Sequence, residues 1–221
     1  MTKPAPGQGP RTPRHFPSSL PPWAGMALGV SRVTCAWLVG SVPFTNYAAL
    51  RWAGKDLRHV GTATVSGTAL YRVAGFWALA LVGPAELAKG ALGAWLSPGT
   101  GGVAAVCGHN WSPLLRFEGG RGLSPMLGAT ALRTPEATVA LAAGMTAGRL
   151  ASNTGLGSFL GLLAAVTATL ARRGPKAAGP VAAMATCVVI KRAAGNGRPR
   201  WPGREFLLHR ILFDCDPGTR R

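Results

Sequence analysis

The sequence consists of long apolar stretches separated by short segments that are rich in glycine, proline and arginine. The apolar stretches run over residues 24–50, 73–96, 101–115, 122–132, 137–147, 155–170 and 177–190. A straight helix needs roughly 20 apolar residues to cross a bilayer, so hydropathy alone supports about four or five of the stretches. We predict an all-α integral membrane protein with about seven transmembrane helices, some of them short, and with glycine-rich cytoplasmic loops.

Lysine and arginine outnumber aspartate and glutamate by 24 to 7, although only 14% of all residues are charged. Nucleic acid and anionic lipid are two partners that fit such an excess of positive charge. A nucleic-acid binder gathers basic residues on one face together with aromatic residues, whereas here they form short clusters between uncharged stretches. The pattern favours a lipid bilayer as the partner and argues against nucleic acid.

The distribution of basic residues also predicts an orientation, because cytoplasmic loops collect lysine and arginine. If the seven stretches alternate in direction, one side carries 15 basic residues and the other carries 7. The richer side is made of residues 51–72, 116–121, 148–154 and 191–221. This asymmetry favours a cytoplasmic C terminus, although the basic cluster at 171–176 falls on the opposite side.

The two ends of the chain differ in composition from its middle. Residues 1–22 are rich in proline and predict a disordered tail, residues 23–205 form the membrane domain, and residues 206–221 form a basic C-terminal tail. The four cysteines are widely separated and form no CxxC pair. They therefore predict neither a metal site nor a disulfide framework.

The segment from Lys55 to Arg72 combines small residues, hydroxyl groups and cations. Small residues let backbone amides approach an oxyanion, hydroxyl groups donate hydrogen bonds, and an arginine can hold two phosphate oxygens at once. The segment therefore suits a phosphate group. An ordinary flexible loop is the alternative interpretation.

A second segment reads Gly119-Gly120-Arg121-Gly122 at the start of an apolar stretch. The three glycines could form a nest of backbone amides for an anion, with the Arg121 side chain reaching into it. The alternative is a glycine turn between two membrane helices, with Arg116 and Arg121 among the lipid headgroups.

Several short motifs, taken together in this order and spacing, resemble one family. They are Gly40-Ser41-Val42-Pro43-Phe44, Asp56-Leu57-Arg58 before Gly61, Gly108-His109-Asn110, and Phe117-Glu118-Gly119-Gly120-Arg121-Gly122. The chain resembles the acyl-phosphate-dependent glycerol-3-phosphate acyltransferases (PlsY type) over about residues 33–205.

The resemblance implies an enzyme of phospholipid synthesis in the cell membrane with several membrane passes. Its substrates would be acyl phosphate and glycerol 3-phosphate, its product lysophosphatidic acid, and an enzyme that produces acyl phosphate a partner. No cofactor and no metal are implied. The implied catalytic residues are His109, Arg121 and Arg72. The implied substrate-binding residues are Gly61, Thr62, Thr68, Gly119, Gly120, Gly122, Ser158 and Asn196.

The sequence also departs from the family pattern. In the first motif only Gly61, Thr68 and Arg72 match, and Arg121 stands where the family has lysine. A catalytically degenerate relative that binds lipid or phosphate is therefore an alternative function, and a small membrane transporter is another.

Two further roles stay open at the level of the sequence. The catalytic base is either His109 or an oxygen of the substrate phosphate, in which case His109 is structural. Glu86 and Lys89 lie three residues apart within an apolar stretch, so they can face each other on one helix. They form either a functional pair or a mutually neutralising structural one.

Overall fold

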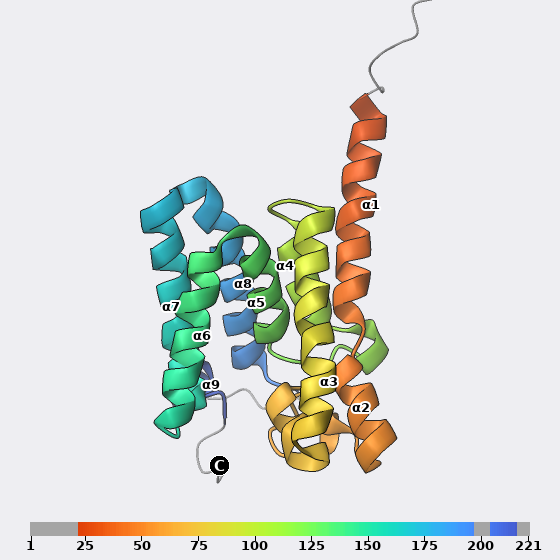
Figure 1. Cartoon of the computed structure of the whole chain (residues 1–221), viewed down its shortest axis with the longest axis vertical. Coiled ribbons are helices and arrows are strands. Elements are labelled where there is room, and N and C mark those ends of the chain that lie inside the picture. Colours follow the sequence, from red (N-terminus) through yellow and green to blue (C-terminus); the bar gives the residue numbers. More distant parts are fainter. Residues whose placement is uncertain (1–21, 197–203, 216–221) are drawn as a thin grey trace, which may run out of the picture.

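The computed structural model describes residues 22–196 and 204–215, and within these ranges it contains helices and no strand (Figure 1). The α-helices are α1 (Pro22–Ser41), α2 (Phe44–Ala53), α3 (Gly67–Leu96), α4 (Gly101–Asn110), α5 (Leu123–Arg133), α6 (Pro135–Leu150), α7 (Thr154–Arg173), α8 (Pro175–Ala194) and α9 (Arg204–Phe213). The first predicted apolar stretch corresponds to α1 and α2, and the other six correspond to α3 through α8. The prediction of an all-α membrane fold is confirmed.

The long helices run side by side and alternate in direction (Figure 1). The connections after α2, α4 and α6, and the C-terminal end of α8, lie toward the end drawn at the bottom of Figure 1, which we call the lower end. They belong to the four basic segments that the charge pattern groups on one side. The segments singled out for phosphate binding therefore share one end of the bundle.

The helices differ in whether they are long enough to cross a bilayer. Four segments are long and apolar enough: Gly25–Ala53, Gly67–Leu96, Thr154–Arg173 and Pro175–Ala194. In contrast, α4 and α5 have only 10 and 11 residues. At 1.5 Å per residue each is about half as long as the ~30 Å hydrocarbon core, so neither crosses the core by itself.

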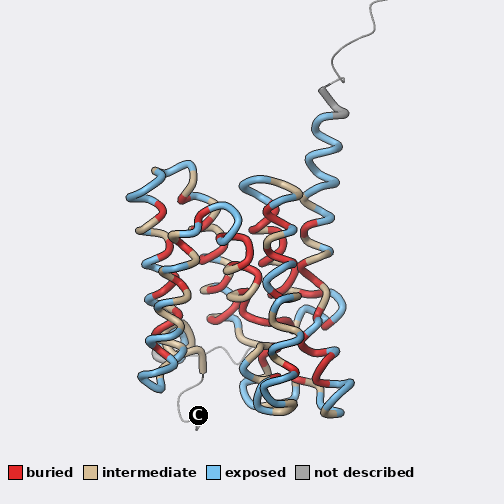
Figure 2. Tube along the Cα trace, in the orientation of Figure 1, coloured by how far each residue is buried: buried red, intermediate tan, exposed pale blue. Residues whose placement is uncertain are grey.

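Buried residues gather where helices meet (Figure 2), and many large apolar side chains are exposed on the outside of the bundle. Trp77, Leu81 and Trp95 on α3 are 77%, 69% and 65% exposed. A soluble protein rarely exposes so many large apolar side chains, whereas lipid tails solvate them. The upper part of α1 projects beyond the other helices and is exposed on most sides (Figures 1 and 2).

Glycines allow neighbouring helices to approach closely. On α6 and α7, a Cβ on Gly144 would lie 2.5 Å from the Cα of Gly161, and one on Gly148 would lie 2.7 Å from the Cα of Gly157. Helices in lipid gain stability from such close backbone packing, since burial of apolar surface drives them together only weakly. The high glycine content therefore belongs to the membrane core as well as to the loops.

Two backbone breaks shape the lower end. α1 and α2 are separated at Val42 and Pro43, and α3 is interrupted at Gly75, whose φ of 81° is left-handed. Each break leaves a short helical segment at the lower end, beside the loop that joins α2 to α3 (Figure 1). Of the predicted tails, residues 1–21 and 216–221 lie outside the described residues, and the boundary placed at residue 206 falls inside α9.

Candidate functional site

The side chain of Asn196 joins three segments that are far apart in the sequence. Its Nδ2 donates hydrogen bonds to the carbonyl oxygens of Ala63, at 2.6 Å, and Gly119, at 2.9 Å. Ala63 belongs to the loop between α2 and α3, which we call the first loop (residues 54–66). Gly119 begins the glycine turn (residues 119–122), and Asn196 follows α8. The structure therefore brings the two sequence-predicted phosphate segments together.

The glycine turn packs directly against the end of α4. The backbone N–H of Gly120 donates to the carbonyl oxygen of His109 at 3.1 Å. A Cβ on Gly122, whose φ is +78°, would lie 2.6 Å from Asn110 Oδ1. The glycines are thus required for close approach to α4, and the amide of Gly120 is already occupied. The predicted anion nest accordingly has fewer free amides than its three glycines suggest.

Gly120→Ala should disturb this contact because the new methyl group would overlap both His109 Nε2 and the carbonyl oxygen of Val65. We expect a destabilisation of about 1–3 kcal/mol, as is typical of overpacking, together with loss of any activity that depends on the turn. Thermal unfolding in detergent measures the change. Gly83→Ala is the control, since a Cβ there meets nothing within 4 Å. Equal stability of the two variants would contradict the close packing.

His109 lies between Glu86 and the glycine turn. Its Nδ1 is 3.4 Å from Glu86 Oε2, and its side chain is 9% exposed. The other ring nitrogen faces Gly120, where an added methyl group would overlap it. A ring held on both sides and largely shielded has little room to contact a substrate hydroxyl, so this geometry favours the structural interpretation of His109.

Glu86 and Lys89 form a buried ion pair, with Lys89 Nζ 2.7 Å from Glu86 Oε2. The pair also binds the break between α1 and α2. Glu86 Oε1 accepts hydrogen bonds from the backbone N–H and the hydroxyl of Thr45, at 3.1 and 2.7 Å, and Lys89 Nζ donates to the carbonyl oxygen of Val42 at 2.9 Å. These contacts fasten α3 to the break and support the structural interpretation of the pair.

Arg121 is buried in protein, with a side chain that is 9% exposed. Its Nη1 donates to the carbonyl oxygen of Lys191 at 2.9 Å, and its Nε lies 2.7 Å from Asp214 Oδ1. A guanidinium held in this way is not an anchor among lipid headgroups, which would leave it exposed. The arrangement instead fixes a cation at the lower end of the bundle.

Two buried cations next to Arg121 were not predicted from the sequence. Lys191 Nζ donates to the carbonyl oxygen of Phe117 at 2.9 Å, and Lys191 is only 2% exposed. Arg192 is 1% exposed and donates to the Ser158 hydroxyl at 2.6 Å. In the sequence both residues look like cations at the end of a membrane helix, which normally face the headgroups.

The remaining predicted residues fall into two groups. The Ser158 hydroxyl, which accepts from Arg192, donates to the carbonyl oxygen of Thr154 at 2.6 Å, so it is satisfied within the protein. By contrast, the first loop and the start of α3 present their predicted residues to the outside. The exposed residues are Gly61, Thr62, Thr68 and Arg72.

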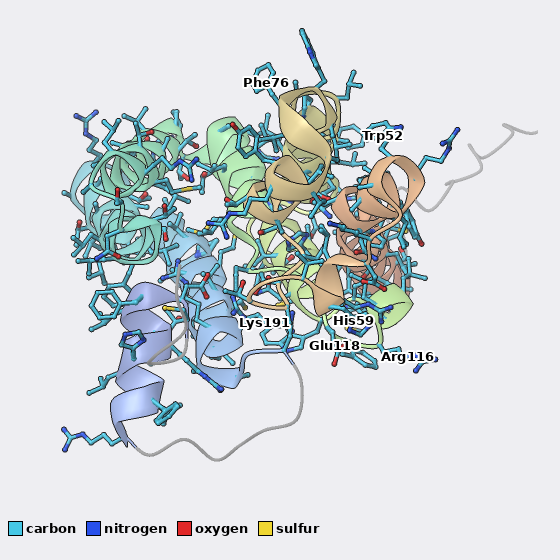
Figure 3. The ribbon with its side chains drawn as sticks, turned by 90° about the horizontal axis from the view of Figure 1, so that it is seen from below. Trp52, His59, Phe76, Arg116, Glu118 and Lys191 are labelled. Atoms are coloured by element: carbon cyan, nitrogen blue, oxygen red, sulfur yellow. The ribbon has the colours of Figure 1, made fainter. Side chains whose placement is uncertain are left out.

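The lower end also carries half-buried charges around the first loop (Figure 3). Asp56 accepts hydrogen bonds from the guanidinium of Arg58, at 2.6 Å from Nη2, and from the Arg58 backbone N–H at 3.0 Å, and these bonds, mainly those of the guanidinium, lower the pKa of Asp56 to about 2. The pKa of Arg58 is raised, mainly by Asp56 and in part by the charge of Glu118. Figure 3 shows His59 and Glu118 at this end.

The site as a whole is strongly cationic. Arg121, Lys191 and Arg192 are all buried, and they have two carboxylates close by: Asp214 pairs with Arg121 and lies near Arg192, and Glu118 lies near Lys191. Burying a charge without a counter-ion is costly, so a cluster with surplus positive charge favours an anionic ligand. Among the described residues, no group of three or more His, Cys, Asp or Glu side chains is placed to hold a metal ion.

Comparison with solved structures relates the fold to known membrane enzymes. The chain is similar to the crystal structure of PlsY, an integral membrane glycerol 3-phosphate acyltransferase, in its glycerol 3-phosphate form. The TM-score is 0.64 at 22% identity, covering 74% of this chain and 88% of PlsY. The lysophosphatidic acid form of PlsY gives a TM-score of 0.63 at 19% identity, with 74% and 87% coverage. This likeness establishes a multi-pass membrane fold.

Sequence comparison identifies relatives with one shared name. The glycerol-3-phosphate acyltransferase of Thermoanaerobacter pseudethanolicus is 34% identical over 136 residues, which are 57% of this chain and 68% of that protein. The glycerol-3-phosphate acyltransferase of Desulforudis audaxviator is 36% identical over 118 residues, which are 49% of this chain and 59% of the relative. The model of the family described as glycerol-3-phosphate acyltransferase matches residues 30–198. The chain therefore belongs to the glycerol-3-phosphate acyltransferase family.

Proposed function

We propose that this chain transfers a fatty acyl group from acyl phosphate to the 1-hydroxyl of glycerol 3-phosphate. The products are lysophosphatidic acid and inorganic phosphate, and the reaction takes place at the cytoplasmic face of the cell membrane. The observation that carries the proposal is the double hydrogen bond of Asn196 to Ala63 and Gly119. It joins the first loop to the glycine turn beside three buried cations, in a member of this family.

The proposed site must hold two phosphate groups next to each other. Arg121 supplies a fixed guanidinium from the protein interior, and Arg72 supplies an exposed one from the short helical segment before Gly75. Thr62 and Thr68 are also exposed and offer hydroxyl donors. Rate acceleration then comes mainly from positioning the substrates and from stabilising negative charge.

The proposed reaction needs no protein base. The 1-hydroxyl oxygen bonds to the acyl carbonyl carbon, the bond from that carbon to the phosphate oxygen breaks, and the hydroxyl proton passes to the departing phosphate. His109 then acts as a positioning residue that supports the glycine turn, in keeping with its contacts to Glu86 and Gly120. An enzyme that produces acyl phosphate would supply the donor.

Purified protein in detergent should convert acyl phosphate and glycerol 3-phosphate to lysophosphatidic acid without added metal or nucleotide. Acyl-coenzyme A should be at least tenfold poorer as a donor, because the proposed site binds the donor through its phosphate. A factor of ten is roughly the effect of losing one charge-assisted contact. Product formation from radiolabelled glycerol 3-phosphate measures both reactions. Equal use of the two donors would disprove the donor assignment. Absence of turnover with donors of several chain lengths would instead indicate a catalytically degenerate relative.

A further inference from the structure

The C-terminal helix α9 lies beyond the residues that the family model matches, yet it is built into the lower end of the bundle. Arg192 Nη1 donates to the carbonyl oxygens of Gly155 and Ile211, at 3.1 Å each, and so joins α7, α8 and α9. A Cβ on Gly155 would overlap the backbone of Phe213. The helix is thus held by a buried arginine and by a backbone contact that only glycine allows.

Asp214 directly follows α9, and its carboxylate lies beside Arg121. Its backbone N–H donates to the carbonyl oxygen of Arg210 at 2.9 Å, and its φ of 56° is left-handed. This conformation is unfavourable for most residues, although aspartate tolerates it better than most. The left-handed conformation of Asp214 places its Oδ1 2.7 Å from Arg121 Nε.

The two protein contacts of Arg121 fix the plane of its guanidinium. The Nε atom pairs with Asp214, and Nη1 donates to the carbonyl oxygen of Lys191. Since a guanidinium is rigid and planar, the hydrogen bond on Nη1 and the ion pair on Nε together restrict where the N–H groups on Nη2 point. Asp214 also supplies negative charge next to Arg121 and Arg192, in a cluster in which Arg121 repels both Lys191 and Arg192.

We propose that Asp214 is a positioning residue that orients Arg121 for the phosphate of glycerol 3-phosphate. This inference rests on the proposed function, in which Arg121 binds phosphate. The alternative role of an internal competitor for Arg121 would require Asp214 to leave when substrate binds. The contacts of α9 with Arg192 and Gly155 oppose that movement. A misdirected guanidinium weakens substrate binding, so the effect of losing Asp214 falls mainly on KM.

The test compares the full-length wild type with Asp214→Asn and Asp214→Ala. We expect both variants to raise KM for glycerol 3-phosphate about tenfold, the margin of one charge-assisted contact, with kcat changed less than about threefold. Asp214→Glu should recover part of the loss because it keeps the charge. Glu136→Gln is the matched control. Glu136 on α6 forms an ion pair with Arg173 on α7, and the distance from Oε1 to Nε is 2.7 Å, as in the pair of Asp214 and Arg121. The control variant should change KM less than about twofold.

A fall in KM for Asp214→Asn would establish the competitor role and overturn the inference. Unchanged KM with lowered thermal stability would also overturn it, because Asp214 would then be only structural. Calorimetric binding of glycerol 3-phosphate separates this inference from the proposed reaction. If the wild type binds glycerol 3-phosphate but does not turn it over, weaker binding by Asp214→Asn still supports the positioning role. If the wild type does not bind it, both fail.

Discussion

Arg121→Ala is expected to lower kcat/KM for glycerol 3-phosphate by about ten- to hundredfold. The change removes a charge-assisted contact to phosphate worth on the order of 1.5–3 kcal/mol, and each 1.4 kcal/mol corresponds to about a factor of ten. It also removes the ion pair with Asp214 and one of the two hydrogen bonds accepted by the carbonyl oxygen of Lys191, which keeps the backbone N–H of Gly195 as a donor. Steady-state kinetics with purified protein measures the loss.

Arg121→Lys tests whether the loss reflects charge. Lysine is the residue that the family resemblance implies at this position, so activity should be retained to within several-fold or increase. Arg133→Ala serves as the control, because Arg133 also donates to a backbone carbonyl oxygen, that of Ala94, but from the opposite end of the bundle. Equal affinity for glycerol 3-phosphate in the wild type and in both Arg121 variants would reject Arg121 as a phosphate ligand.

The fold could be predicted from the sequence because membrane helices leave a strong local signal. Each apolar stretch became a helix or a pair of helices, and the alternation of basic segments matched the two ends of the bundle. Helix length was less certain, since the short α4 and α5 are packed between neighbours rather than crossing the bilayer alone. Their shortness depends on tertiary packing, which hydropathy does not report.

The candidate site was predicted less completely. The importance of the glycine turn and of Asn196 followed from the motifs, but the contacts that they make did not. Position 120 requires glycine because His109 of α4 packs against it, and Asn196 donates to the carbonyl oxygen of Ala63, which is 133 residues away. Lys191 gave no signal at all, because a cation at a helix end has the same local sequence whether it faces headgroups or protein. Such roles depend on long-range contacts.

The second large effect is expected at the buried ion pair, where Lys89→Met should lower the free energy of unfolding by about 3–5 kcal/mol. The substitution keeps the apolar stem but leaves the Glu86 carboxylate buried without its cation, and it removes the hydrogen bond to Val42. Unfolding in mixed micelles by titration with a denaturing detergent measures the change. Lys176→Met is the control, since Lys176 is exposed and its loss should cost little.

A double variant separates the loss of the pair from the cost of an unpaired charge. Glu86→Gln with Lys89→Met removes both charges, while the amide oxygen of the introduced glutamine can still accept the hydrogen bonds of Thr45. If most of the destabilisation comes from the buried unpaired carboxylate, the double variant should be more stable than Lys89→Met by at least about 1 kcal/mol, since contacting charges are strongly non-additive. If both variants are equally destabilised, the helix break at Val42 depends on the lysine hydrogen bond, and the pair is not primarily a device for neutralising charge.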